Sequence, residues 1–289
     1  MSWKNGVEKM LSEKLNEDVK ILSDHYVGGG SINDARMVKT TKGDFFVKIN
    51  SASRYPAMFE KEAKGLALLA ATNEIAVPQV VGFGEENNEA FLILNYINSA
   101  PKSKNFWVQF GEKLAALHKH THKLFGLDYN NYIGSLQQSN RQHNSWPGFF
   151  KEERLEPLVA MAFNDGKIDR TILLGFDRFY NKIDNLFPDE SPALVHGDLW
   201  GGNYMVGANG EPVIIDPAVY YGHREMDLGM SQLFGGFDQQ FYSAYHRAFP
   251  LEPGWQERLD FCNLYPLMVH VNLFGGGYAG SVKSILMRF

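Results

Sequence analysis

The most informative part of the chain is the stretch LVHGDLWGGN at residues 194–203, followed by IIDP at residues 214–217. It contains Asp198, then Asn203 five residues later, and then a second aspartate, Asp216. An Asn-Gly turn at 209–210 lies between the last two and predicts a tight hairpin. Such a hairpin would bring oxygens of Asn203 and Asp216 to one hard cation. One Asp and one Asn suit Mg²⁺, which also takes phosphate oxygens and water.

The spacing between His196 and Asn203 narrows the chemistry of this stretch. His-x-Asp followed by four residues and Asn is the order of kinase catalytic loops, in which the Asp accepts a hydroxyl proton and the Asn and a later Asp hold Mg²⁺. We therefore predict Asp198 as the base, and Asn203 and Asp216 as the Mg²⁺ ligands. A carboxylate is basic enough, because phosphoryl transfer needs mainly orientation and late proton acceptance. The alternative for Asp198 is a turn residue that bonds its own backbone.

Two further polar residues near this motif favour a structural interpretation. His196 could be a base, since imidazole titrates near neutrality, but its position two before Asp198 indicates packing and backbone bonding. Asp227, in the segment GHREMDLG at 222–229, begins a predicted helix. It would cap that helix or hold the backbone of the catalytic loop.

Composition limits the class of protein and its partners. The chain has 289 residues, 44% of them hydrophobic and 21% charged, which is ordinary for one large globular domain or two lobes. A net charge of −5 argues against nucleic acid or an anionic membrane as the main partner, so we expect a small molecule. Cys262 is the only cysteine, which excludes an intrachain disulfide and predicts a reducing, cytoplasmic compartment. Residues 1–13 show no continuous apolar run, so no signal peptide or transmembrane helix is expected there.

The N-terminal part alternates short β patterns with turns. An amphipathic helix with Val7, Leu11 and Leu15 on one face comes first. Strands are then predicted at 19–27, 35–40, 44–49, 77–83 and 90–96. Together they predict a five-stranded antiparallel sheet.

A glycine-rich turn joins the first two of these strands. It consists of Gly28, Gly29, Gly30 and Ser31. Because a strand and not a helix follows, the turn belongs to a β-meander and argues against Rossmann and Walker-type phosphate loops. Glycine N–H groups in such a turn could still approach phosphate oxygens closely, although an ordinary turn is the alternative.

Lys48 and Glu62 form a predicted pair. Lys48 is central in the apolar strand 44–49, where a charged side chain is costly unless it finds a partner or a ligand. Glu62 falls on the apolar face of the next predicted helix, 55–71, together with Phe59 and Leu66. Such a pair would hold the ammonium against the α- and β-phosphates of ATP. The alternatives are a lysine on a solvated edge strand and a solvated helix glutamate.

The last predicted strand leads into a hinge. Main-chain groups of Asn95, Tyr96 and Ile97 would bind adenine, and residues 98–103 would be the linker. We therefore predict an N-terminal nucleotide-binding lobe of residues 1–97 and a C-terminal lobe of residues 98–289. Helices in the second lobe are expected at 106–117, 147–164, 167–186, 226–234, 237–247 and beyond residue 253, with a loop at 126–145. The fold class is α+β, with an antiparallel β lobe and a mainly helical lobe.

Longer motifs make the chain resemble a known family. They are HGDLWGGN at 196–203, IDPA at 215–218, YGHRE at 221–225, GGG at 28–30, FVK at 46–48, MFEKE at 58–62 and the segment 146–155. In these the chain resembles the fructosamine kinases, or ketosamine-3-kinases, which are relatives of aminoglycoside phosphotransferases with a two-lobe protein-kinase-like fold. The resemblance covers nearly the whole chain. His-Gly-Asp alone indicates only the wider phosphotransferase group. Trp200 within the motif narrows the resemblance to the fructosamine kinases.

The resemblance implies ATP-dependent phosphorylation of the C3 hydroxyl of ketosamines, free or on protein lysines. The product breaks down and releases the amine, which repairs glycation damage. The resemblance also implies Asp198 as base, Asn203 and Asp216 as Mg²⁺ ligands, Lys48 and Glu62 as the phosphate-orienting pair, and residues 28–31 as the nucleotide loop. Trp200 would stack on the sugar-amine, with a core role as the alternative. Several family members have Cys where this chain has Ser31, so a disulfide-linked dimer is not implied and a monomer is expected.

Two other functions compete with this one. The first is phosphorylation of another small alcohol, such as choline, homoserine or an aminoglycoside. Polycationic aminoglycosides need clustered carboxylates, yet the last acidic residue is Asp260 and the tail 281–289 carries only Lys283 and Arg288 as charges. The second is a non-catalytic nucleotide-binding protein, which the presence of all the predicted catalytic residues disfavours. The preferred sugar, whether fructosamine, ribulosamine or erythrulosamine, stays open.

Overall fold

The chain folds into two compact units. The computed structural model describes residues 2–28, 33–275 and 277–289, so Gly29, Gly30 and Ser31 of the predicted nucleotide loop lie outside the described residues. Unit 1 comprises residues 1–106 and 202–217, and unit 2 comprises residues 107–201 and 218–289. The lobe boundary between residues 97 and 98 stays a prediction. Unit 1 differs from the predicted N-terminal lobe because it includes residues 98–106 and the segment 202–217.

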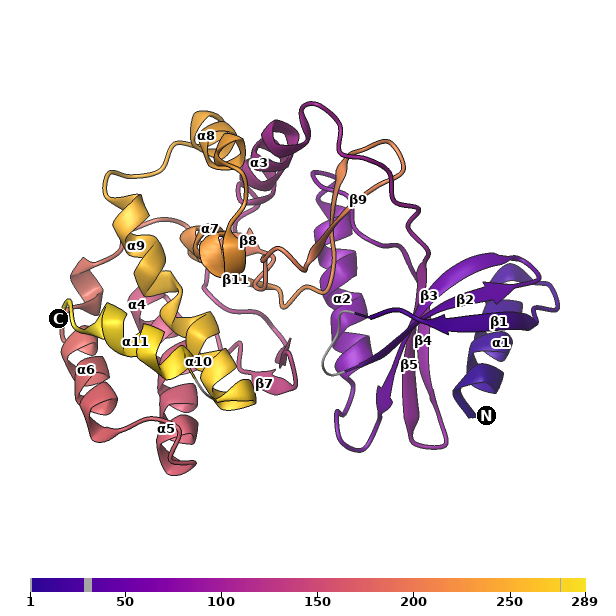
Figure 1. Cartoon of the computed structure of the whole chain (residues 1–289), viewed down its shortest axis with the longest axis horizontal. Helices are drawn as coiled ribbons and strands as arrows, with labels where there is room; N and C mark the ends of the chain where they lie inside the picture. The colour runs from indigo at the N-terminus through magenta and orange to yellow at the C-terminus, as the bar shows by residue number, and fades with distance from the viewer. Residues whose placement is uncertain (1, 29–32, 276) are drawn as a thin grey trace. The chain divides into compact units, whose positions relative to one another are not determined.

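Unit 1 is built around the antiparallel sheet that the sequence predicts (Figure 1). Its elements are α1 (Ser2–Leu15), β1 (Ile21–Tyr26), β2 (Asp34–Thr40), β3 (Gly43–Ser51), α2 (Met58–Ala71), β4 (Val80–Glu86), β5 (Glu89–Asn95), β9 (Tyr204–Val206) and β10 (Pro212–Ile214). The strand order β1-β2-β3-β5-β4 places β3 and β5 inside the sheet, between their neighbours. The five predicted strands and both predicted helices are confirmed, with ends that differ by a few residues.

The alternation of side chains along β5 explains how two helices pack on this sheet. Successive residues of a strand point to opposite faces. Phe91 and Ile93 join the apolar cluster of α1, whereas Leu92 and Leu94 join that of α2, and Figure 1 shows the two helices on opposite sides of the sheet. Lys48 on β3 lies directly opposite Leu92 in the register and therefore shares its face. The burial of β5 on both faces thus directs Lys48 toward α2.

The predicted hairpin of residues 203–216 is confirmed as strands β9 and β10 of unit 1. Its Asn-Gly turn contains Gly210 at a φ of 79°, in the left-handed region that glycine adopts readily. Two backbone hydrogen bonds attach the hairpin to the rest of unit 1. The N–H of Ile214 donates to the carbonyl of Ala76 at 3.0 Å, and the N–H of Ser103 donates to the carbonyl of Gly210 at 3.1 Å.

Unit 2 is mainly helical, as predicted. Its elements are α3 (Phe106–Leu117), β6 (Asn131–Ile133), β7 (Leu136–Gln138), α4 (Trp146–Phe149), the π-helix η1 (Phe150–Leu155), α5 (Glu156–Asn164), α6 (Arg170–Tyr180), η2 (Ile183–Asn185), β8 (Ala193–Val195), β11 (Tyr220–Gly222), α7 (Glu225–Gln232), η3 (Leu233–Gly235), α8 (Gln239–Ala248), α9 (Trp255–Cys262), α10 (Leu264–Phe274) and α11 (Tyr278–Leu286). A large apolar core joins helices α4, α5, α6, α10 and α11 with η1.

Three parts of unit 2 differ from the prediction. The expected loop 126–145 contains the short hairpin β6–β7, and β8 pairs with β11 although neither strand was predicted. The helix expected at 167–186 ends at Tyr180, and a separate short turn, η2, follows it. The β8–β11 pair matters most, because β8 leads directly into the catalytic loop.

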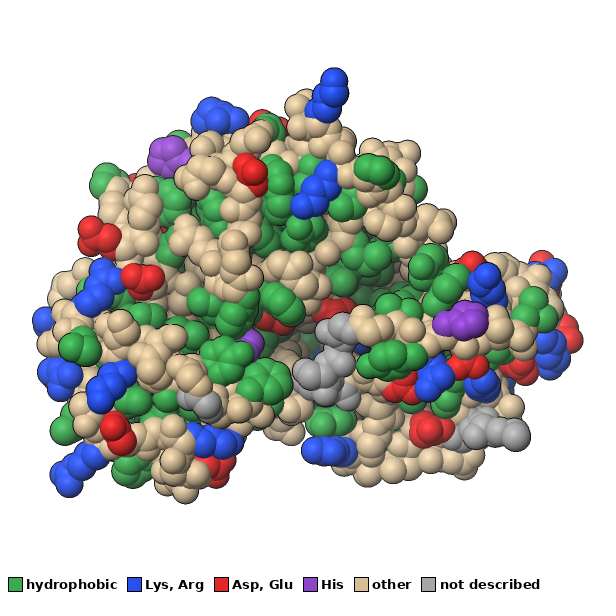
Figure 2. Space-filling view, in the orientation of Figure 1, with side chains coloured by type: hydrophobic (Ala, Val, Ile, Leu, Met, Phe, Trp, Pro, Cys, Tyr) green, Lys and Arg blue, Asp and Glu red, His purple; other side chains and the backbone are tan. Residues whose placement is uncertain are grey.

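Charged side chains of both signs lie on the surface. On the face shown in Figure 2, acidic and basic side chains are interspersed and neither sign gathers into one large patch. Among the described residues, no helix has the length and apolar character needed to cross a membrane.

Candidate active site

Lys48 is the centre of an ion-pair cluster in unit 1. Its Nζ lies 2.8 and 2.9 Å from the two carboxylate oxygens of Glu62, and 3.2 Å from Oδ1 of Asp216. Only 6% of the Lys48 side chain and 11% of the Glu62 side chain are exposed, against 43% for Asp216. The predicted contact between Lys48 and Glu62 is therefore present, and Asp216 is a second carboxylate partner.

The surroundings of Lys48 keep its charge. Burial by itself would lower the pKa of the ammonium, but the carboxylates of Asp216 and Glu62 outweigh that effect and raise the pKa well above its ordinary value. Lys48 thus stays protonated at every physiological pH. A fixed, desolvated cation of this kind is suited to binding phosphate oxygens.

Asn203 and Asp216 lie at the two ends of the β9–β10 hairpin. The N–H of Ile215 donates to the carbonyl of Asn203 at 3.0 Å, which continues the hairpin pairing beyond the strands. Asp216 follows with a φ of 55°, a left-handed conformation that Asp tolerates better than most residues. Its carboxylate contacts Lys48 through Oδ1 and is nearly half exposed. Carboxylate and amide oxygens at adjacent strand ends are a donor set that fits Mg²⁺.

In unit 2, the catalytic loop is held by its backbone. The N–H groups of His196 and Gly197 donate to the two carboxylate oxygens of Asp227, at 2.7 and 2.9 Å. The N–H of Asp198 donates to Nδ1 of His196 at 3.2 Å. His196 is fully buried, which agrees with its predicted structural role. Asp227 holds the backbone of the catalytic loop, which is one of the two roles predicted for it.

Gly197 cannot be replaced by any other amino acid without strain. Its φ is 83°, and a Cβ added there would lie 2.2 Å from the carbonyl oxygen of Ala218. The backbone must come this close because Ala218 N–H donates to the carbonyl of His196 at 2.9 Å. The Gly of His-Gly-Asp therefore allows the catalytic loop to pack against the segment that leads into β11.

His118, the residue that follows α3, completes the support of the loop and was not predicted. Its Nε2 lies 3.1 Å from Oδ2 of Asp227, and its Nδ1 lies 2.7 Å from the hydroxyl of Tyr245. A carboxylate can only accept, so Nε2 carries the proton of this bond. Burial would raise the pKa of Asp227. The hydrogen bond from His118, the electrostatic attraction of the nearby histidines and the backbone N–H of Gly197 outweigh burial and lower the pKa below its ordinary value. A histidine next to the apolar stripe of a helix gave no signal that it reached Asp227.

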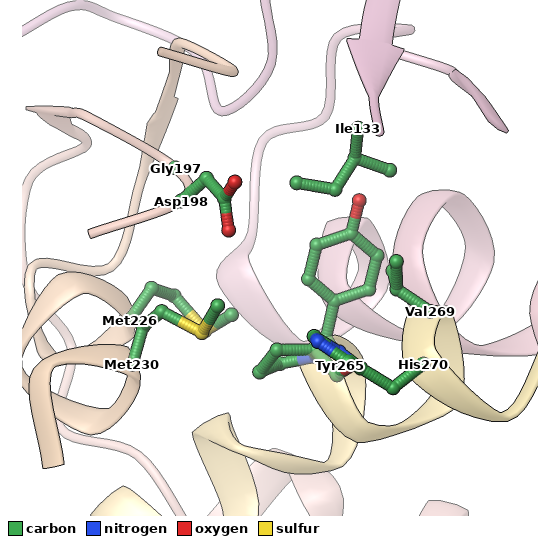
Figure 3. Close-up of a pocket in the computed structure, with 9 residues that line it drawn as sticks. Ile133, Gly197, Asp198, Met226, Met230, Tyr265, Val269 and His270 are labelled. Atoms are coloured by element: carbon green, nitrogen blue, oxygen red, sulfur yellow. The ribbon is translucent and has the colours of Figure 1, made fainter. Parts of the chain in front are cut away.

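A pocket in unit 2 places Asp198 beside apolar and aromatic side chains (Figure 3). It is lined by Ile133, Gly197, Asp198, Met226, Met230, Tyr265, Pro266, Val269 and His270. Among these described lining residues, Asp198 is the one carboxylate. Tyr265 is oriented by its hydroxyl, which donates to Oε1 of Gln138 at 2.5 Å. Sequence reasoning missed the α10 residues of this wall, because a continuous apolar helix gives no sign of which face a pocket exposes.

Trp200 lies two residues after Asp198 in the same unit. Its N–H donates to the carbonyl of Asp198 at 3.2 Å, so a tight turn connects them. The indole meets the ring of Phe234 edge to face, with centroids 6.1 Å apart. It is partly exposed, unlike a core tryptophan such as Trp146.

The remaining predicted nucleotide contacts are less defined. Gly28 is exposed, and its three successors lie outside the described residues. Asn95 uses its N–H in the sheet, donating to the carbonyl of Gln79 at 3.0 Å, and its side chain bonds that of Gln79 at 2.8 Å. Within the predicted hinge, this leaves the main chain of Tyr96 and Ile97 as the better candidates for adenine.

Comparison with known proteins agrees with this geometry. The family model for fructosamine kinase matches residues 3–289. The chain is 41% identical over 288 residues to a protein-ribulosamine 3-kinase of Arabidopsis thaliana, a match that covers 96% of this chain and 85% of that protein. It also resembles the crystal structure of a protein described as a fructosamine-3-kinase from Haemophilus somnus, with a TM-score of 0.89, 29% identity, and coverage of 98% of this chain and 96% of that one.

More distant structures share the fold alone. An aminoglycoside phosphotransferase solved in complex with AMP-PNP and hygromycin B has a TM-score of 0.63 at 16% identity, over 98% of each chain. The predicted protein-kinase-like fold class is thereby confirmed. On the extent of the family match and the identity to its relatives, this chain belongs to the fructosamine kinase family, whose members are phosphotransferases.

Proposed function

We propose that this chain transfers the terminal phosphoryl group of ATP to the C3 hydroxyl of ketosamines, the adducts that reducing sugars form with amines. The observation that carries the proposal is the buried ammonium of Lys48 with its two carboxylate partners. Burying a charged cluster in an apolar sheet costs free energy and contributes little to stability. Binding of a phosphate group explains why the cluster is present. The ribulosamine 3-kinase relative supports a ketosamine as the acceptor.

In the proposed reaction, Asp198 orients the sugar hydroxyl and accepts its proton. The C3 oxygen forms a bond to the terminal phosphorus as the bond from that phosphorus to the bridging oxygen breaks, and ADP leaves. The hydrogen-bonded anchor at Asp227 keeps the Asp198 loop in place, so orientation needs no reorganisation during the reaction. The phosphorylated ketosamine then breaks down and releases the amine, which makes the activity a repair of glycation damage.

The nucleotide is assigned to residues of unit 1. Lys48, positioned by Glu62, would pair with the α- and β-phosphates. Residues 28–31, Gly28, Gly29, Gly30 and Ser31, would donate backbone N–H groups, and Tyr96 and Ile97 would bind adenine. The AMP-PNP complex of the distant phosphotransferase supports ATP as the donor in this fold.

Mg²⁺ is the metal that we propose for Asn203 and Asp216. When bound, it neutralises charge on the phosphate oxygens. The exposed carboxylate of Asp216 and the hairpin that connects it to Asn203 support this assignment.

The pocket beside Asp198, which we name the acceptor pocket, disfavours a polycationic substrate. Among its described lining residues, one carboxylate, Asp198, faces several apolar side chains. An aminoglycoside would bring more ammonium groups than this pocket could neutralise. A ketosamine carries a single amine next to its sugar.

We also propose that the protein acts as a cytoplasmic monomer. Cys262 is buried, and burial raises the pKa of its thiol well above the ordinary value. A protected thiol neither forms a disulfide between copies nor needs an oxidising compartment. Light scattering on the purified protein would test the monomer, and a dimer mass would contradict it.

The test compares three ketosamines on lysine, formed from fructose, ribulose and erythrulose skeletons, with ATP and Mg²⁺ and with ADP release as the readout. We expect phosphorylation of at least one of them, and loss of that activity in Asp198→Asn with an unchanged melting temperature. If none reacts while choline does, the assigned acceptor is wrong. If Asp198→Asn keeps full activity, the assigned base is wrong.

A further inference from the structure

Four aromatic side chains meet in unit 2, and one of them, His270, lines the acceptor pocket. The ring of His270, which lines the pocket, lies 4.7 Å from that of Phe234 and 5.0 Å from that of Tyr278, measured between centroids. Phe234 in turn meets Tyr278 at 6.2 Å and Trp200 at 6.1 Å, in both cases edge to face. These four residues, which we name the aromatic cluster, all belong to unit 2. They connect the turn after Asp198 to the helices α10 and α11.

His270 presents a hydrogen-bond acceptor. Its Nδ1 lies 2.7 Å from the carbonyl oxygen of Pro266, and a carbonyl can only accept, so Nδ1 carries the proton. Burial lowers the pKa of His270, although the Pro266 carbonyl opposes this, so the ring is neutral near pH 7. Nε2 therefore has a lone pair, and no described residue donates a hydrogen bond to it. Figure 3 shows the ring of His270 reaching from α10 toward the middle of the pocket.

Phe234 is held in a conformation that its own preferences do not explain. Its φ of 58° and ψ of 42° are left-handed, which is a strained region for an aromatic residue. The side chain nevertheless remains 44% exposed, so burial does not compensate the strain. Gly235 and Gly236 follow with φ values of 111° and 73°, and complete a turn that presents Phe234 to solvent beside His270. Strained backbone that persists without burial is typical of ligand-binding segments.

The chemistry of the cluster selects a cation. The faces of aromatic rings carry negative charge density and attract ammonium groups. The neutral Nε2 of His270 adds an acceptor for an N–H donor. Among the described residues that line the pocket, the carboxylate of Asp198 is the only full negative charge, and the proposed reaction already occupies it with the C3 hydroxyl.

We propose that the aromatic cluster binds the protonated amine of the substrate, with His270 Nε2 accepting an N–H hydrogen bond and the exposed ring of Phe234, which Tyr278 supports edge to face, lying beside the charge. The inference rests on the proposed function, because the amine of a ketosamine is attached to C1, a short way along the carbon chain from the hydroxyl at Asp198. The cluster is then what distinguishes a sugar-amine adduct from a plain sugar. Trp200 closes the side of the cluster nearest the catalytic loop.

The experiment compares a charged and a neutral substrate of the same sugar. Both carry the sugar on a lysine whose α-amine is blocked. The charged one has the free secondary amine, and the neutral one is acetylated at that nitrogen; it is assayed by ADP release, or as a competitive inhibitor if it is not phosphorylated. In Phe234→Leu we expect the KM of the charged substrate to rise by about tenfold with kcat little changed, and the KM or inhibition constant of the neutral one to stay the same. His270→Leu should behave likewise, and His270→Gln, which keeps an acceptor oxygen, should recover most of the loss.

Phe163→Leu is the matched control, because Phe163 is 41% exposed and lies on α5, outside the pocket lining. It should leave both substrates unaffected. Equal changes for the charged and the neutral substrate, or no change for either, would overturn the amine site. The proposed function fails separately, namely when wild-type protein phosphorylates no ketosamine at all.

Discussion

Replacing Asp227 by Asn tests how firmly the catalytic loop depends on one carboxylate. Asp227 is fully buried and accepts hydrogen bonds from the N–H groups of His196 and Gly197 and from Nε2 of His118. An amide offers one oxygen and one NH₂ group. The better of its two orientations keeps the bonds of Oδ2 to His196 and His118 and turns the NH₂ group against the N–H of Gly197. A donor then faces a donor in the loop that carries Asp198.

The cost of Asp227→Asn follows from these bonds. A hydrogen bond to a charged group contributes about 1.5–3 kcal/mol, and a buried N–H left without an acceptor costs about 1–3 kcal/mol. The two effects overlap, so we expect a loss of about 3–5 kcal/mol in the free energy of unfolding. For a chain of this size, the melting temperature should fall by about 6–15 °C.

Thermal unfolding at pH 7, followed by circular dichroism, measures this loss. Asp260→Asn is the matched control, because Asp260 pairs with Arg288 at 2.7 Å on the surface, where an ion pair contributes about 0–1 kcal/mol. We also expect kcat to fall in Asp227→Asn, since the loop no longer holds Asp198 in one orientation. The reasoning is refuted if Asp227→Asn melts at the same temperature as Asp260→Asn and retains the wild-type kcat.

The pH dependence of the stability of wild type and Asp227→Asn gives a second readout. The pKa of Asp227 in the folded protein is below its ordinary value of 3.8. A depressed carboxylate pKa stabilises the folded state fully above the unfolded pKa, and this stability is lost as the pH falls through the folded pKa. The stability difference between wild type and Asp227→Asn should therefore stay constant near neutrality and shrink in acid below about pH 4.

Three further predictions concern other groups. Lys48→Met should lower kcat/KM for ATP by about 100-fold while the fold persists, as measured by ADP release, because the phosphates lose their buried cation; an unchanged rate would remove Lys48 from the nucleotide site. Asp216→Asn should raise the Mg²⁺ concentration for half-maximal activity by about tenfold or more, and an identical metal titration would contradict its role as ligand. His223 is buried, and burial lowers its pKa to about 4. The wild-type protein should therefore lose up to about 3 kcal/mol in the free energy of unfolding as the pH falls from 6.5 toward 4. Urea unfolding at pH 7.5 and pH 5 measures this loss, and His223→Phe should show a smaller difference between the two pH values.

Much of unit 1 could be predicted because its signals are local. Strands with alternating or apolar patterns and an Asn-Gly turn define the sheet and the hairpin without knowledge of the tertiary structure. The contact between Lys48 and Glu62 could also be predicted, because each charge stands out against an apolar face. Asp216 as a second partner of Lys48 could not, since the hairpin is distant in sequence and nothing local indicates where it attaches.

Unit 2 was harder to predict because its site depends on long-range packing. The three-residue strands β8 and β11 are too short to show a pattern, and their pairing joins segments that are far apart in sequence. The left-handed Phe234 contradicts the preference of its residue type, so no propensity would have indicated it. His118 directly follows α3 and His270 lies on α10, both beside apolar residues, where sequence alone cannot separate a hydrogen-bonded core histidine from one that faces a pocket.

The two-faced burial of β5 also sets which changes of length the family can tolerate during evolution. Deleting one residue within β3, ahead of Lys48, would turn its side chain to the α1 face and separate it from Glu62, whereas deleting two would restore the face. The turn at Asn87 and Asn88, where both φ values are positive, lies outside this constraint and can absorb insertions. We therefore expect relatives of this chain to vary in length at the sheet's turns and to keep the length of β3 and β5 fixed.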